Sequence, residues 1–196
     1  GTVEGELDEV RQAALAKADQ LHQAAATAVD SVRYTRLILS FARWLLGNEW
    51  RESLRQLKGK DLRKRLKIFS QDMLEKDQQR LKKRGRQLKD ADAKTRHRVR
   101  IAAKKMRYDT EFFQSLYPSN ETKEYVAALA DLQDGLGSLN DIAVGESLLL
   151  QIEQDQSGLS GITGFIRGYL AARAAEDERK VKKLWKKFKT KQLPSF

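Results

Sequence analysis

Three cationic side chains and a histidine fall on one narrow strip when residues 96–113 are drawn as an α-helix of about 100° per residue. The strip contains His97, Arg100, Lys104 and Arg107, and Glu111 lies at its end. Two apolar faces flank it: a broad one formed by Val99, Ala103, Met106, Thr110 and Phe113, and a narrower one formed by Ile101, Tyr108 and Phe112. We expect such a strip to lie in a groove between packed helices, where its cations repel one another unless an anion binds. The spacing therefore indicates anion binding, and the alternative is the solvated face of an ordinary basic helix.

The residue types on and beside this strip suit a phosphate-rich ligand. Arginine forks bind pairs of phosphate oxygens, lysine acts as a point charge, and a protonated histidine donates from both ring nitrogens. Tyr108 could donate its hydroxyl at the edge of the groove, and Lys105 could serve a groove wall or face water. Glu111 follows Arg107 by one helical turn, so it is better explained as a salt-bridge partner than as a general acid.

A second basic strip occurs on the helix predicted over residues 31–46. This helix is apolar nearly all round, so we expect it to be central in the fold. Its polar exceptions form a single strip, which contains Arg33, Arg36, Ser40 and Arg43. They could be the one solvent-facing side of the helix, but a groove shared with the strip of residues 96–113 would explain both.

A third set of cations belongs to the long basic helix predicted over residues 59–89. Its core register is expected to be Leu62, Leu66, Phe69 and Met73. Continued along the helix, that face becomes polar: Arg80 and Arg84 take the next inward positions and Lys83 lies beside them. These three residues either contribute to the anion site or mark a helix end that projects into water.

Composition favours a binding protein over an enzyme. The chain has 196 residues, a net charge of +11, two histidines and no cysteine. We find no metal-ligand cluster, glycine-rich phosphate loop, nucleophile elbow or close acid pair, so we expect no catalytic residue, no metal and no cofactor. The positive charge predicts a polyanionic partner. The lack of cysteine agrees with a cytoplasmic protein, and no membrane span or signal peptide is expected.

The fold class predicted is all-α, an antiparallel bundle of about six helices in one domain of residues 1–196. Residues 1–29 are expected to form a connecting helix and residues 30–196 the bundle. The pair Asp30-Ser31 is a predicted N-cap, Asp92 caps the helix of residues 96–113, and Gly85 is a tolerated weak point. The segment Leu129–Asp141 is expected to be a tight helix–turn–helix in which glycines form the turn and Asn140 caps the following helix. A final helix is predicted over residues 163–189.

The central motif resembles the signature of the CHAD domain (conserved histidine α-helical domain). In this chain it reads HxxRxxxKKxRYxxE, from His97 to Glu111. Two further segments are similar to that family: KKRGRQL at Lys82–Leu88, and LADLQDGLGSLND at Leu129–Asp141. The resemblance extends from about Ser31 to Lys187. We find no N-terminal motif like HQxRVxxRRLR, so the chain resembles the C-terminal half of such a domain, one four-helix bundle, plus a connecting helix.

The resemblance implies binding of inorganic polyphosphate in a basic groove, without catalysis. It also implies a possible CYTH-type triphosphatase domain on the same polypeptide. As the chain resembles half a domain, it could pair with the missing half or with a second copy. Three alternatives remain open from the sequence: a nucleic-acid-binding helical domain, a scaffold docking on acidic partners or polyphosphate granules, and an accessory domain of a triphosphatase.

Overall fold

The computed structural model describes residues 2–47, 50–51 and 65–194. Over these residues the chain forms six α-helices and three short 3₁₀ helices, with no strand, so the all-α prediction is confirmed. The residues group into two compact units, 1–64 and 65–196. The predicted single domain, with a connecting helix at residues 1–29 and a bundle at 30–196, stays a prediction.

The first unit contains helices α1 (Val3–Val29) and α2 (Val32–Leu46). The predicted N-cap at Ser31 is confirmed, because its Oγ accepts a hydrogen bond from the Tyr34 backbone N–H at 3.2 Å. Helix α2 ends at Gly47, whose N–H donates to the Arg43 carbonyl at 2.7 Å. No side chain of α2 is buried, so the central position expected for this helix is not met within its unit.

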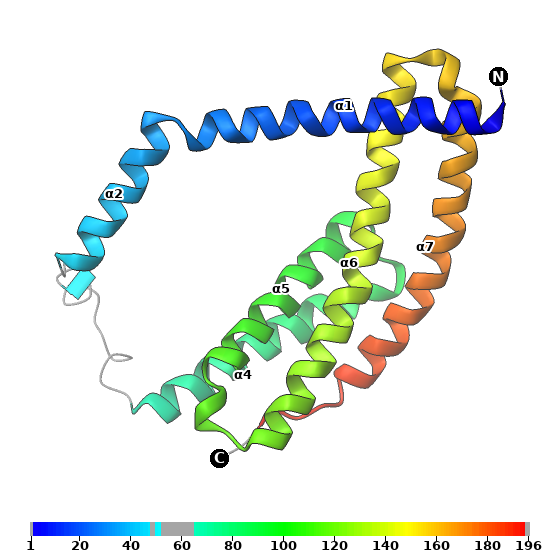
Figure 1. The fold of residues 1–196 in the computed structure, drawn as a ribbon. Coiled ribbons are helices and arrows are strands. Elements are labelled where there is room, and N and C mark those ends of the chain that lie inside the picture. Colours follow the sequence, from blue (N-terminus) through cyan, green and yellow to red (C-terminus); the bar gives the residue numbers. More distant parts are fainter. Residues whose placement is uncertain (1, 48–49, 52–64, 195–196) are drawn as a thin grey trace. The chain divides into compact units, whose positions relative to one another are not determined.

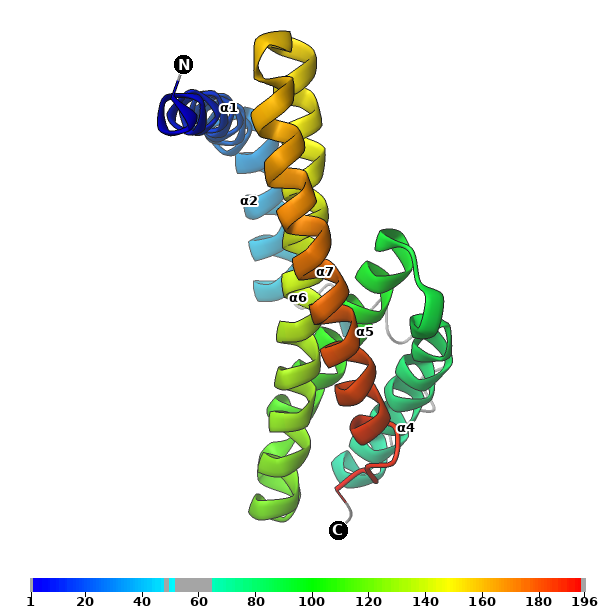
Figure 2. The same cartoon turned by 90° about the vertical axis from the view of Figure 1, so that its right-hand side faces the viewer.

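The second unit is built from four α-helices with short connections. They are α4 (Leu66–Gly85), α5 (Ala93–Phe112), α6 (Ser119–Asp155) and α7 (Ser160–Phe188), with 3₁₀ helices at Arg86–Asp90 (η2), Gln114–Leu116 (η3) and Ser157–Leu159 (η4). Helix α5 packs against α4 and α6, and α6 packs against α7 (Figure 1). Both views show α6 and α7 as an antiparallel hairpin whose connecting end extends beyond α4 and α5 (Figure 2).

The core of this unit lies between the four helices. Its fully buried members are Leu74 and Leu81 of α4, Val99, Ala103 and Met106 of α5, Tyr125, Leu129, Leu132, Leu136 and Leu139 of α6, and Val181 and Phe188 of α7. The broad apolar face predicted for α5 is confirmed, since all five of its residues are buried. The narrower face is exposed: Phe112 keeps 79% of its surface accessible, and Ile101 and Tyr108 about half. Within this unit the cationic strip therefore has packed side chains along one flank only.

The register predicted for α4 is confirmed at Phe69 and Met73, which are half-buried against the core, but not at Leu66 or Arg80. The buried residues of α4 include Leu74, Asp77 and Leu81, whereas Leu66 is exposed and the Arg80 side chain is 53% exposed. Burying Leu74 and Leu81 removes apolar surface from water, while turning Arg80 and Arg84 inward would desolvate two charges. Residues 59–64, with Leu62, lie outside the described residues.

Helix α6 corrects the prediction of a helix–turn–helix at Leu129–Asp141, because it runs unbroken through this segment. Its glycines serve close packing and form no turn. A Cβ at Gly135 would lie 3.0 Å from Cγ2 of Val181 on α7, and one at Gly137 would lie 3.6 Å from Nε of Arg100 on α5. The contact at Gly135 is tight, so the absence of a side chain there lets α7 approach α6, whereas the contact at Gly137 is an ordinary one.

Candidate anion-binding site

Helix α5 presents the predicted strip along its boundary with α6. The predicted cap is confirmed: Oδ1 of Asp92 accepts from the Thr95 backbone N–H at 2.8 Å, and this bonding with Thr95 lowers the pKa of Asp92. With Val99, Ala103 and Met106 directed into the core, the strip residues are placed at the edge of that face. His97 is exposed, and Arg100, Lys104 and Arg107 are half-buried.

His97 is held by α6. Its Nδ1 lies 3.0 Å from Oδ1 of Asn140, so the histidine is anchored to the neighbouring helix. When the amide oxygen accepts, Nδ1 carries a hydrogen and Nε2 is the nitrogen left for a ligand. Asn140 was expected to cap a helix, and its contact with His97 is a site feature that the sequence reasoning missed.

Arg100 passes over Gly137 of α6 and reaches a surface hollow between α5, α6 and α7. The residues lining this hollow are Arg100, Gln133, Asp134, Gly137, Ser138, Asp141, Ile142, Leu170 and Arg173. The Nε of Arg100 is buried, and within the described part of the chain it has no hydrogen-bond partner. A buried guanidinium N–H without an acceptor is unfavourable, so this atom is an unsatisfied donor beside a hollow that also contains Asp134 and Asp141.

Arg107 already donates two hydrogen bonds within the protein. Its Nε donates to Oε1 of Gln133 at 3.1 Å, and its Nη1 donates to Oε1 of Glu111 at 3.1 Å. The interpretation of Glu111 as the salt-bridge partner of Arg107 is therefore confirmed. The ring of Tyr108 lies 5.0 Å from the Arg107 guanidinium carbon and 5.5 Å from Lys104 Nζ, so it holds both cations from one side.

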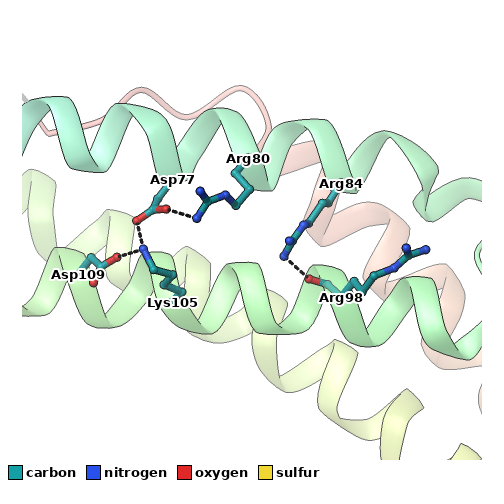
Figure 3. A network of polar contacts seen from close by, with 6 residues as sticks. All are labelled: Asp77, Arg80, Arg84, Arg98, Lys105 and Asp109. Atoms are coloured by element: carbon teal, nitrogen blue, oxygen red, sulfur yellow. Dashed lines mark hydrogen bonds and ion pairs between the residues drawn. The ribbon is translucent and has the colours of Figure 1, made fainter.

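Lys105 lies on the other side of α5, where it joins α4 to α5. Its Nζ donates to Oδ2 of Asp77 at 2.6 Å and to Oδ2 of Asp109 at 3.1 Å, and Asp77 also accepts from Arg80 Nη1 at 3.1 Å (Figure 3). The hydrogen bond that Lys105 donates to Asp77 raises the pKa of Lys105. Two carboxyl groups therefore hold the Lys105 ammonium, and its bond to Asp77 joins α5 to α4.

The two carboxyl groups of this network differ in their affinity for a proton. Burial is the largest single effect on both, and it favours the protonated form. At Asp77 the hydrogen bonds with Asp109 and Lys105 outweigh burial, so its pKa is lowered. At Asp109, burial and the hydrogen bond with Asp77 prevail and raise the pKa. Asp77, which is only 5% exposed, is thus the anion that Lys105 and Arg80 neutralise.

A cationic stripe along α4 is a second candidate surface, separate from the hollow at Arg100, and we call it the α4 stripe. It consists of Lys76, Gln79, Arg80, Lys83 and Arg84 of α4 and Gln87 of η2, which line one surface hollow. The structure thus brings together the three predicted residues: Arg80 and Lys83 are exposed, and Arg84 is half-buried. Arg84 also reaches α5, where its Nη1 donates to the Arg98 carbonyl at 3.2 Å (Figure 3).

Sequence reasoning missed three members of the α4 stripe: Lys76, Gln79 and Gln87. Their spacing of three, four or seven residues from the predicted cations is the signal that could have found them. No carboxylate is among the residues that line this hollow. The stripe can therefore offer ammonium, guanidinium and amide donors to successive groups of a linear anion.

The three arginines predicted on α2 belong to the first unit. Arg33, Arg36 and Arg43 lie along one side of α2 and are exposed. The groove that they were expected to share with the α5 strip stays a prediction.

The described residues contain neither a metal-binding cluster nor a membrane-spanning helix. No group of three or more histidine, cysteine, aspartate or glutamate side chains there is arranged to hold a metal ion. No helix in the same residues has both the length and the apolar content needed to cross a membrane.

Comparisons with known proteins agree with the sequence motifs. The family model for the CHAD domain matches residues 2–150. The crystal structure of the CHAD domain from the plant Ricinus communis is similar, with 33% sequence identity and a TM-score of 0.66, and the match covers 93% of this chain. The chain spans 62% of the length of that protein. No curated protein matches the chain. On the motif around His97, the all-helical bundle and these matches, the chain belongs to the CHAD domain family.

Proposed function

We propose that this chain binds inorganic polyphosphate, or a similar linear polyanion, without catalysing its conversion. The observation that carries the proposal is the α4 stripe, a surface hollow lined by two lysines, two arginines and two glutamines with no carboxylate among them. Cations arranged along one helix face suit a ligand that carries charge at regular intervals. The α5 strip adds donors on the neighbouring helix, among them Arg100, whose Nε has no hydrogen-bond partner in the described part of the chain.

The charge of the whole chain and the family support the same ligand class. The net charge of +11 attracts polyanions from a distance. The resemblance of the motif from His97 to Glu111 to the CHAD signature implies polyphosphate. This proposal also includes a cytoplasmic or granule location. It includes pairing of the chain with a second copy or with a missing half, and a CYTH-type domain on the same polypeptide.

Calorimetric titration of the full chain tests the proposal. Long-chain polyphosphate, a DNA duplex and a single-stranded oligonucleotide are compared at the same salt concentration, without divalent metal. We expect polyphosphate to bind most tightly, and its affinity to fall steeply as salt rises because each neutralised phosphate releases counterions. Tighter binding of either nucleic acid would favour the nucleic-acid alternative, and affinity that is indifferent to salt would contradict the proposal.

Two double variants locate the site. Lys76→Gln with Lys83→Gln removes two charges from the α4 stripe, and Lys183→Gln with Lys186→Gln removes two exposed charges from α7. We expect the stripe variant to lose at least about tenfold in polyphosphate affinity and the α7 control less than about threefold. Equal losses would mean that binding follows net charge alone and that the stripe is not the site.

A further inference from the structure

A small cavity lies where η2 meets helices α5, α6 and α7, apart from both surfaces described above. Its volume is about 110 Å³, and its lining consists of Leu88, Lys89, Ala91, Arg96, Leu139, Glu178, Val181 and Lys182. Three of the apolar members, Leu88, Leu139 and Val181, are buried and form its floor. The cavity has room for more than one water molecule, so a compact polyatomic ion fits it.

Arg96 brings an unused donor to this cavity. Its Nη1 donates to the Ala91 carbonyl at 2.7 Å and to Oε1 of Glu178 at 2.8 Å, which holds the guanidinium in place. Its Nε is buried and, among the described residues, has no hydrogen-bond partner. The side chain as a whole is only 19% exposed. The fold therefore fixes a charged fork and leaves one of its buried N–H groups without an acceptor.

The charges around the cavity favour an anion. Lys89 of η2, Arg96 of α5 and Lys182 of α7 are cations from three different elements, and Glu178 is the only carboxylate in the lining. That carboxylate is already bound to Arg96, so two positive charges remain without a counter-charge in the lining. The buried apolar floor lowers the local dielectric, which strengthens attraction to an anion. A doubly charged anion would balance the site.

We propose that this cavity binds a single phosphate group. Arg96 donates from its buried guanidinium edge, and Lys89 and Lys182 close over the anion from two sides. The phosphate is either free orthophosphate or the terminal group of a longer phosphate chain, since both present the same charged oxygens. Because the residues differ from those of the α4 stripe, this inference does not rest on the proposed polyphosphate function.

The experiment measures binding of orthophosphate and of tripolyphosphate to the full chain by calorimetry. The test variant carries Lys89→Gln and Lys182→Gln, which leave the bonds of Arg96 to Ala91 and Glu178 in place. Controls are the α7 pair Lys183→Gln with Lys186→Gln and the stripe pair Lys76→Gln with Lys83→Gln. We expect the test variant to lose about tenfold or more in affinity for orthophosphate, and both controls to keep theirs within about threefold.

The two ligands separate the sources of the phosphate. Orthophosphate binding that depends on Lys89 and Lys182 identifies a pocket for the free ion. If orthophosphate does not bind but tripolyphosphate loses affinity only in the test variant, the pocket holds a terminal group. If neither ligand depends on these lysines, or if either control loses as much, the proposal is overturned. The proposed function is tested independently, by titrating the Lys76→Gln and Lys83→Gln stripe variant with long-chain polyphosphate, so it can fail while the cavity proposal stands.

Discussion

His97 and Asn140 meet across the boundary between α5 and α6, with Nδ1 of the histidine 3.0 Å from Oδ1 of the asparagine. The two residues are 43 positions apart in the chain, and each belongs to a segment that resembles a CHAD motif. The contact fixes the orientation of the imidazole, so α6 decides which ring nitrogen of His97 is available to a ligand. Under the proposed function, Asn140 thus sets how His97 meets the anion.

The first prediction concerns this contact. Asn140→Ala frees the imidazole to rotate, so polyphosphate affinity should fall by about threefold to tenfold, less than the loss caused by His97→Ala. Calorimetric titration measures both affinities. In the double variant that carries both His97→Ala and Asn140→Ala, the second change should cause no further loss of affinity, since Asn140 acts only through His97. Additive losses would show that Asn140 has no positioning role, and Gln151→Ala, an exposed change on the same helix, is the control.

The second prediction separates two adjacent lysines of α5. Lys105→Met should lower the free energy of unfolding by about 1–3 kcal/mol, because the buried Asp77 loses its closest cation. Lys104→Met should change it by less than about 0.5 kcal/mol, the usual range for a surface change. Urea denaturation measures both. For polyphosphate affinity we expect the reverse, a larger loss in Lys104→Met than in Lys105→Met. If one variant showed the larger loss in both stability and affinity, the separate roles of the two lysines would be contradicted.

The third prediction contrasts two helical glycines. A Cβ at Gly85 would lie 2.2 Å from the Trp185 ring, which is rigid, so Gly85→Ala should destabilise the protein by about 1–3 kcal/mol despite the better helix propensity of alanine. A Cβ at Gly137 would make an ordinary contact of 3.6 Å with Arg100. Gly137→Ala is therefore the matched control and should be neutral or stabilising by up to about 1 kcal/mol. A neutral Gly85→Ala would mean that Trp185 moves away easily.

The fourth prediction is a pH dependence of stability from Asp177. Its hydrogen bond from Ser138 Oγ, at 2.6 Å, is the main cause that lowers its pKa; burial opposes the shift, and Arg173 and Lys180 add to it. A carboxyl group whose pKa is lower in the folded state stabilises the fold above its ordinary value of 3.8, and this stability is lost as pH falls through the folded value. Asp177→Asn should therefore reduce the loss of Tm between about pH 6 and about pH 2.5.

Two further results decide the interpretation of Asp177. Asp131→Asn removes the same formal charge from an exposed position of α6 and should leave the acid-induced loss of Tm unchanged. Asp77 also has a lowered pKa and should contribute in the same direction, whereas Asp109, whose pKa is raised, is stabilising in its protonated form and contributes in the opposite direction. An Asp177→Asn variant with the pH profile of the unmodified chain would contradict the assignment.

Much of the fold could be predicted from local patterns. The all-α class, the caps at Ser31 and Asp92 and the buried face of α5 follow from signals within a few residues of each other. The full register of α4 and the continuity of α6 could not be predicted in this way. Gly135 and Gly137 look like turn residues in isolation, and only the approach of Val181 from α7 gives Gly135 a packing role.

The sequence by itself determined the candidate site residues and the family: a helix with His97, Arg100, Lys104 and Arg107 on one strip, an excess of positive charge, and the motif that marks the CHAD family. Tertiary structure decided how those charges are used. It placed Lys105 between two carboxyl groups and brought Arg80, Lys83 and Arg84 together along the α4 stripe. The reason is physical: spacing along a helix fixes the face on which a side chain lies, but its partner comes from another helix, and only packing brings the two together.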